Sequence, residues 1–224
     1  MDKLKINITK RLSTYIYERF NIFSYSLLII AMFFSGMVLA RSNFSLSFIP
    51  ILLILFLYFL RLRMYDDIKD YQIDIKLKPY RPLPRGLVTR NEILITTYTL
   101  LILEMVIIVY TDIRLIVPYS LVILFSLITF REFFIGRILR KNILLYALPH
   151  ILLMASIGSF LYYSVTVLSA LQFQLSKFLL FGFICYIAGL LFEISRKMPN
   201  IHENKSSRES FISLLGFNIA WAIF

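Results

Sequence analysis

Residues 62–90, LRMYDDIKDYQIDIKLKPYRPLPRGLVTR, form a polar stretch in an otherwise very apolar sequence, and they decide how the chain can fold. Four aspartates open the stretch: Asp66, Asp67, Asp70 and Asp74. If the preceding helix continues through them, their spacing places all four carboxylates within an arc of about 100°. We therefore expect one acidic helical face at the boundary between two apolar segments.

The chemistry of this stretch favours a phosphorylated ligand. Carboxylates one helical turn apart repel each other unless a cation lies between them. Mg²⁺ suits such a face, because it is usually held by one or two carboxylates together with the phosphates of a substrate. Phosphate-binding donors follow in the sequence: Lys76, Lys78, Arg81 and Arg85. A solvated loop of mixed charge is the alternative interpretation of the same residues.

The end of the stretch, residues 81–86, is stiff and then flexible. Pro82 and Pro84 each fix their own φ and disfavour helix in the residue before them. We expect the acidic helix to stop before Tyr80, and Gly86 to permit a tight turn into the next apolar segment.

Two motifs in this order resemble the UbiA superfamily of intramembrane prenyltransferases. The pattern Asp66-Asp67-x-x-Asp70-x-x-x-Asp74 resembles the first aspartate-rich motif of that family, which usually begins with Asn where this chain has Asp66. Residues 81–86, Arg-Pro-Leu-Pro-Arg-Gly, resemble the Arg-Pro-Leu-x-x-Gly segment that follows it. The loop at residues 131–142 and the span after it are similar to a less studied branch rather than to the quinone-pathway members. The resemblance extends from about residue 60 to residue 217.

The resemblance implies a fold and an activity. The fold is an all-α, polytopic transmembrane helical bundle with nine spans in the full-length protein. The activity is transfer of a prenyl group, an alkyl group other than methyl, from a polyprenyl diphosphate to an acceptor, with Mg²⁺ as cofactor. The four aspartates would be catalytic and metal-binding residues, and Lys78, Arg81 and Arg85 would bind the diphosphate.

Composition independently indicates a multi-pass membrane protein. The 224 residues are 59% hydrophobic and 17% charged, with a mean hydropathy of +0.77, too apolar for a soluble domain of this length. The candidate spans are residues 22–40, 44–61, 91–111, 114–130, 143–163, 174–192 and 210–224. The last of these would rise only about 22 Å as a helix, less than a bilayer core of roughly 30 Å. Since the resemblance implies nine spans, we expect the chain to be truncated.

The net charge of +11 would suggest a nucleic-acid partner in a soluble protein, but the basic residues sort into loops. With the N-terminus in the cytoplasm, 21 of the 24 Lys and Arg residues fall on the cytoplasmic side. We expect both motif loops, 62–90 and 192–208, to be cytoplasmic, the bilayer to be the partner, and no nucleic acid to bind. Residues 1–21 are compatible with a basic interfacial helix, and residues 22–224 with one transmembrane domain.

The loop at residues 192–208, FEISRKMPNIHENKSSR, lies where the family carries a second aspartate-rich motif, but the run of aspartates is missing. The resemblance carries over Glu193 as a catalytic and metal-binding carboxylate. Arg196 and Lys197 would meet phosphate oxygens directly. A simple ion pair between Glu193 and Lys197 at a helix end is the alternative, and the number of metal ions stays open.

Glu104 is an acidic residue inside a predicted span, so we expect it to face the interior of the bundle. Either a functional role or a neutral, hydrogen-bonded role in helix packing would explain it.

Two other functions fit the same residues. One is transfer of phosphoribose from a diphosphate donor to a polyprenyl phosphate. The other is a non-catalytic membrane protein that binds polyprenyl phosphate lipids. The acceptor and the length of the donor chain are not readable from the sequence.

Overall fold

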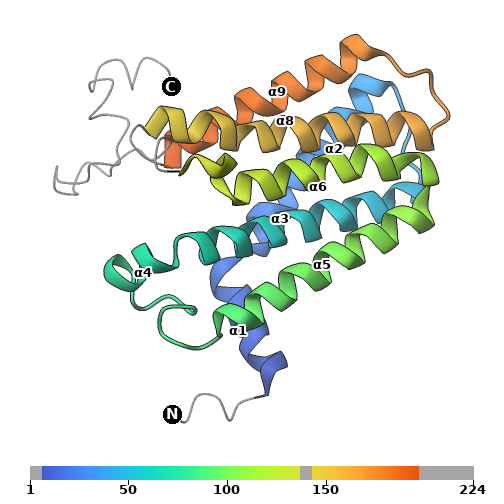
Figure 1. Ribbon diagram of the computed structural model, residues 1–224. Coiled ribbons are helices and arrows are strands. Elements are labelled where there is room, and N and C mark those ends of the chain that lie inside the picture. Colours follow the sequence, from blue (N-terminus) through green and yellow to red (C-terminus); the bar gives the residue numbers. More distant parts are fainter. Residues whose placement is uncertain (1–6, 137–142, 197–224) are drawn as a thin grey trace. The chain divides into compact units, whose positions relative to one another are not determined.

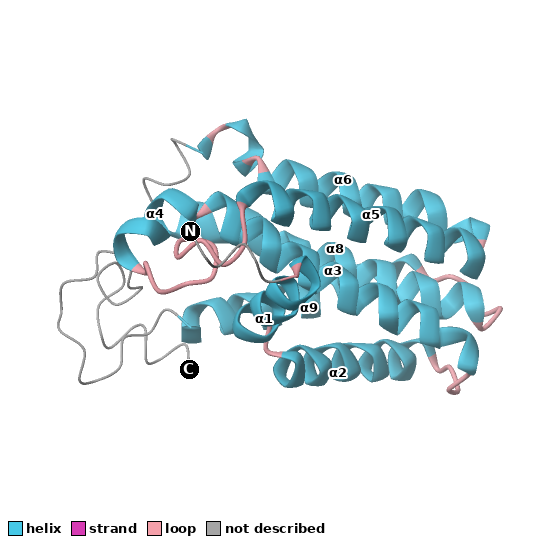
Figure 2. Ribbon diagram, turned by 90° about the horizontal axis from the view of Figure 1, so that it is seen from below, coloured by secondary structure: helices cyan, strands magenta, loops and turns pink. Residues whose placement is uncertain are grey.

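The computed structural model describes residues 7–136 and 143–196, and within these ranges the chain contains helices and loops but no strand (Figure 2). Six of its helical segments are long and apolar enough to cross a membrane: Ile22–Ala40, Leu46–Lys69, Arg90–Thr111, Ile113–Phe130, Leu148–Leu168 and Leu175–Phe192. They confirm the all-α class and six of the seven predicted spans. The seventh, residues 210–224, lies outside the described residues.

The chain divides into two compact units, which we describe separately. The first contains residues 1–121 and 164–173, and the second contains residues 122–163 and the chain from residue 174 onward. All four aspartates of the acidic motif belong to the first unit.

The first unit is built around α3, Ile49–Lys69. It packs along most of α5, Arg90–Thr111, and also against α2, Ile22–Ala40 (Figure 1). Half of the membrane-length window of α3 is buried, compared with 22% for α5 and 28% for α2. Because α3 also carries Asp66 and Asp67, the acidic motif begins at the end of the most buried helix of the unit.

Local signals explain where these helices begin. The side chain of Asn7 caps α1, Ile8–Arg19, and that of Asn21 caps α2, so each satisfies a backbone N–H that the first turn leaves free. Pro50 lies in the first turn of α3, where its missing N–H removes no helical hydrogen bond. Thr89 and Glu92 form a reciprocal capping box at the start of α5.

The helix that carries the aspartates is not continuous. It is interrupted at Asp70, which ends α3 and precedes α4, Tyr71–Leu77. The prediction of an uninterrupted helix through the motif was therefore wrong at this residue. Backbone hydrogen bonds from Asp70 N–H to the Asp66 carbonyl and from Asp74 N–H to the Asp70 carbonyl preserve the one-turn spacing on both sides of the break. The predicted stop before Tyr80 is confirmed.

The turn after α4 confirms the role predicted for Gly86. Its φ of +74° lies in the left-handed region, and its N–H donates to the Leu83 carbonyl. The next N–H, that of Leu87, donates to the Pro82 carbonyl. The loop therefore doubles back on itself before α5 begins.

Replacing Gly86 with alanine is expected to destabilise this turn by about 1–2 kcal/mol, because a Cβ is unfavourable at this φ although the space beside it is open. Gly86→Asn should destabilise the turn less than Gly86→Ala, since asparagine tolerates the left-handed region. Thermal unfolding of the purified variants in detergent checks the order of stability. Equal melting temperatures for the alanine variant and the parent protein would contradict it.

The described part of the second unit pairs α8, Ile143–Leu168, with α9, Leu175–Arg196, through small residues. A Cβ added at Gly158 would meet Cys185, and one at Gly182 would meet Ser159. Ser159 also donates a 3.3 Å hydrogen bond to the Phe178 carbonyl. Close approach through glycine is a common way for helices to associate in membranes.

Candidate functional site

The four aspartates of the motif fall into two pairs that differ in burial and in partners. Asp67 and Asp74 are buried, and both form ion pairs with arginines. Asp66 is exposed, with 52% of its side chain accessible, and Asp70 is partly exposed. The single acidic face predicted from the sequence therefore separates into a buried pair and an accessible pair.

Asp67 is held by residues from two helices. Its Oδ2 atom accepts hydrogen bonds from the Tyr15 hydroxyl at 2.8 Å and from Arg19 Nε at 2.9 Å, both in α1. Its Oδ1 atom lies 2.6 Å from Arg19 Nη2 and 3.1 Å from Arg63 Nη2, the latter one turn earlier in α3. Two guanidinium groups thus share one carboxylate.

Burial, together with the neighbouring Asp67 carboxylate, raises the pKa of Tyr15 well above its ordinary value, so the phenol stays protonated. Burial opposes the charge of Arg19, but its hydrogen bond and attraction to Asp67 outweigh this and raise the Arg19 pKa. Both α1 side chains therefore act as permanent donors to Asp67 at neutral pH.

Asp74 is paired with Arg81. Arg81 Nη1 donates to both carboxylate oxygens of Asp74, at 2.8 and 2.6 Å. This contact ties α4 to the loop that follows it, in the segment where the two prolines already restrict the backbone. Arg81, predicted to bind a diphosphate, is thus held beside the motif by one of the motif's own aspartates.

Changing Asp74 to asparagine is expected to release Arg81 and loosen residues 78–86, because the charged partner of a partly buried arginine is lost. We expect faster hydrogen exchange across this loop and a modest loss of thermal stability. Arg81→Gln should have a similar effect, and the double variant should be little worse than either one. Hydrogen exchange measured by mass spectrometry checks this, and additive effects would contradict it.

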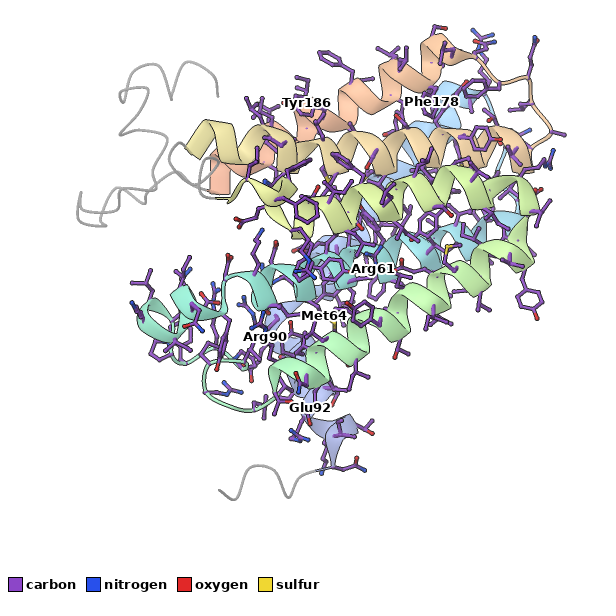
Figure 3. The ribbon with its side chains drawn as sticks, in the orientation of Figure 1. Arg61, Met64, Arg90, Glu92, Phe178 and Tyr186 are labelled. Atoms are coloured by element: carbon purple, nitrogen blue, oxygen red, sulfur yellow. The ribbon has the colours of Figure 1, made fainter. Side chains whose placement is uncertain are left out.

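The N-terminal helix α1 is fastened to the motif region at two further places. Arg11 contacts Glu92 at 2.6 Å and donates to the Leu87 carbonyl at 3.2 Å. Glu18 contacts Arg85 at 2.7 Å. In Figure 3, Glu92 lies at the beginning of α5, close to α1. Residues 8–19 are therefore part of the site, and Arg85, another predicted phosphate ligand, is half-exposed beside them.

A buried ion pair lies deeper in the first unit. The side chains of Arg61 in α3 and Glu104 in α5 are both fully inaccessible, and Arg61 Nη2 lies 2.9 Å from Glu104 Oε2. The hydroxyl of Tyr119, in α6, Ile116–Phe130, donates to the same carboxylate at 2.9 Å. The rings of Tyr58 and Tyr65 flank the guanidinium. This contact confirms that Glu104 faces the interior and shows that three membrane-length helices are joined there.

The remaining predicted residues are only partly described. Lys78 is exposed at the end of α4. Glu193 and Arg196 lie in the last turn of α9, but their side chains fall outside the described residues, as does all of Lys197. Within the described part of the chain, no group of three or more His, Cys, Asp or Glu side chains is placed to hold a metal ion.

Several residues of the site were missed from the sequence. Arg63 could have been found, because it stands four residues before Asp67 on the same helical face. Tyr15 and Arg19 could not, because about 50 residues separate them from the aspartate that they contact. A surface depression at the junction of α1 and α2, lined by Ser13 and Tyr17 among others, includes none of the motif aspartates.

These features define a multi-pass membrane protein with a cluster of carboxylates and arginines at one end of its central helix. Comparison with protein-family models matched residues 27–220 to the UbiA prenyltransferase family. The chain belongs to the UbiA prenyltransferase family, and membership implies membrane prenyltransferase activity on lipid-linked prenyl substrates. No curated protein and no solved structure matched the chain.

Proposed function

We propose that the protein transfers a prenyl group from a polyprenyl diphosphate to an acceptor, with Mg²⁺ and with the diphosphate bound at the end of α3. The observation that supports this most strongly is that the four aspartates of the motif form one buried pair and one accessible pair. Two accessible carboxylates, Asp66 and Asp70, lie beside two buried ones whose arginines are already in place.

The accessible pair fits the protein's share of a Mg²⁺ site. Mg²⁺ usually takes one or two protein carboxylates and fills its other positions with water and phosphate oxygens. Asp66 and Asp70 stand one helical turn apart and supply two such carboxylates. When bound there, Mg²⁺ would neutralise charge on a diphosphate. We propose Glu193 as a further ligand from the second motif loop.

The reaction requires the C1–O bond of the prenyl diphosphate to break, with the electron pair leaving on the diphosphate oxygen. The acceptor then forms a bond to C1 and loses a proton. We propose that Arg81 stabilises the developing negative charge; its ion pair with Asp74 and its partly buried position support this role. We propose that Lys78, Arg85, Arg196 and Lys197 contribute further positive charge.

The position of the site suits a lipid substrate. The helix α3 has 21 residues and spans about 30 Å, so a diphosphate at its end lies near the boundary of the hydrocarbon core. The prenyl chain can then extend among the apolar helices. We propose that this end faces the cytoplasm, because the basic residues concentrate in the loops on that side.

A comparison of donors tests the proposal. The full-length protein in nanodiscs containing membrane lipids is given a prenyl diphosphate or phosphoribosyl diphosphate, and release of inorganic pyrophosphate is measured with Mg²⁺ or with EDTA. We expect Mg²⁺-dependent release from the prenyl donor. Release from phosphoribosyl diphosphate, with a polyprenyl phosphate as acceptor, would replace our proposal with the phosphoribosyl reaction.

A further inference from the structure

Arg63 is an arginine with spare hydrogen-bonding capacity at the membrane side of the acidic motif. Its one hydrogen bond among the described residues runs from Nη2 to Asp67 Oδ1, at 3.1 Å, and Arg19 holds the same oxygen more closely, at 2.6 Å. Arg63 Nε is buried and makes no hydrogen bond within the described part of the chain. A guanidinium group has five N–H donors, so most of those on Arg63 remain available to a ligand.

Arg63 shares its aspartate with a second arginine. Asp67 carries one negative charge and forms ion pairs with two arginines, Arg19 and Arg63, of which Arg19 lies closer. The side chain of Arg63 is 21% exposed and belongs to a membrane-length helix. A partly exposed guanidinium that shares one carboxylate with a second arginine can also donate to the oxygens of a further anion. Arg63 can therefore bind an anionic group and keep its contact with Asp67.

The helical geometry places that anion next to Asp66 and Asp70, the accessible pair that we propose to hold Mg²⁺. Arg63 stands three residues before Asp66, and side chains three apart are neighbours on a helix. It also lies within about 20° of the line through Asp70, two turns away. Because α3 runs from Ile49 to Lys69, Arg63 is nearer than either aspartate to the membrane interior.

From these contacts we infer that Arg63 binds the diphosphate of the prenyl donor, on the side from which the prenyl chain leaves. In this arrangement Asp67 is a positioning residue, which holds Arg63 and Arg19 in place, rather than a ligand of the metal. The inference rests on the proposed function and assigns to that site two arginines that sequence reasoning did not select.

The position of Arg63 gives it a defined role in the reaction. The oxygen that leaves C1 is the diphosphate oxygen nearest the prenyl chain, and it acquires negative charge as the bond breaks. A guanidinium on the membrane side of Asp66 and Asp70 can donate to this oxygen and would leave both carboxylates to hold Mg²⁺. Arg63 can keep its contact with Asp67 meanwhile, because that contact uses one nitrogen.

Binding of labelled inorganic pyrophosphate to the full-length protein in nanodiscs tests the assignment, with Mg²⁺ or with EDTA. Arg63→Gln should weaken pyrophosphate binding about ten- to a hundredfold, the effect expected when a hydrogen bond to a charged group is lost. The pyrophosphate affinity of Arg63→Lys should lie between those of the parent protein and Arg63→Gln, since lysine keeps the charge but lacks the planar set of N–H donors. Arg114→Gln is the matched control, because Arg114 pairs with Asp112 beyond the opposite end of α5 and should leave binding unchanged.

A Mg²⁺ titration separates positioning from metal binding. If Asp67 positions the arginines, Asp67→Asn weakens pyrophosphate binding but leaves the half-saturating Mg²⁺ concentration unchanged. In contrast, Asp70→Asn raises that concentration. A rise of similar size in Asp67→Asn would overturn the positioning role.

The outcomes for Arg63 distinguish this inference from the proposed function. Loss of pyrophosphate binding in folded Arg63→Gln supports the inference even if no prenyl transfer is found. Unchanged binding in both Arg63 variants overturns the inference and leaves the proposed function standing. If Arg63→Gln does not fold, Arg63→Lys decides. A parent protein that binds no pyrophosphate under either condition overturns the inference, whereas failure to consume a prenyl diphosphate overturns the proposed function.

Discussion

Asp70→Asn is expected to lower the rate of prenyl transfer by at least about a hundredfold while leaving the folded protein intact. Asp70 is partly exposed, stands at the break between α3 and α4, and supplies half of the accessible carboxylate pair. Removing its charge weakens the neutralisation of the diphosphate in the transition state, and losses of this kind typically reach two to three orders of magnitude. Initial rates of pyrophosphate release at several Mg²⁺ concentrations check the prediction.

A matched control comes from the other end of α5. Asp112 is also an aspartate in an ion pair with an arginine, but it lies between two membrane-length helices and away from the acidic motif. Asp112→Asn should keep near-normal activity. Undiminished activity in Asp70→Asn, or an equal loss in both variants, would show that Asp70 has no special part in the reaction.

Glu104→Ala is expected to destabilise the protein by about 3–5 kcal/mol, the largest effect on stability that we predict. The variant leaves the fully buried Arg61 without its carboxylate and removes the acceptor for Tyr119. An uncompensated buried charge costs this much in proteins generally. Thermal unfolding in detergent, followed by circular dichroism, measures the shift in melting temperature.

The double variant Arg61→Met, Glu104→Leu provides the internal control for this pair. Replacing both charges with apolar side chains of similar size removes the desolvation cost together with the attraction. We therefore expect the double variant to be clearly more stable than Glu104→Ala. A double variant that is less stable than the single one would show that the three helices depend on the ion pair itself.

The spans could be predicted because hydropathy is a local property of the sequence. The boundaries were less accurate where a local signal was overlooked. The helix of the second span was expected to continue through Asp74; α3 does continue past Arg61, but it ends at Lys69, before the break at Asp70. Thr89 and Glu92 form a capping box that the sequence already displays as Thr-x-x-Glu.

The contacts of a functional residue were harder to predict than its place in the fold. Glu104 was expected in the interior because an acid within a span must avoid lipid. Its partner, Arg61, was predicted to be the last residue of a span and was counted with the cytoplasmic basic residues, and the two residues stand 43 positions apart. The same holds for the acidic motif: its residues were identified by type and spacing, whereas the contact between Asp67 and Arg19 depends on how α1 packs. Long-range packing is not encoded in any local pattern.

The most direct test of the central claim is a search for the lipid product. The full-length protein in nanodiscs is incubated with an isotopically labelled prenyl diphosphate and a membrane lipid extract, with Mg²⁺ or with EDTA, and the lipids are analysed by mass spectrometry. We predict a new lipid that carries the labelled prenyl group, appears only with Mg²⁺ and is missing in Asp70→Asn. A donor that is bound but never transferred, under any of these conditions, would contradict the proposal that the protein is a prenyltransferase.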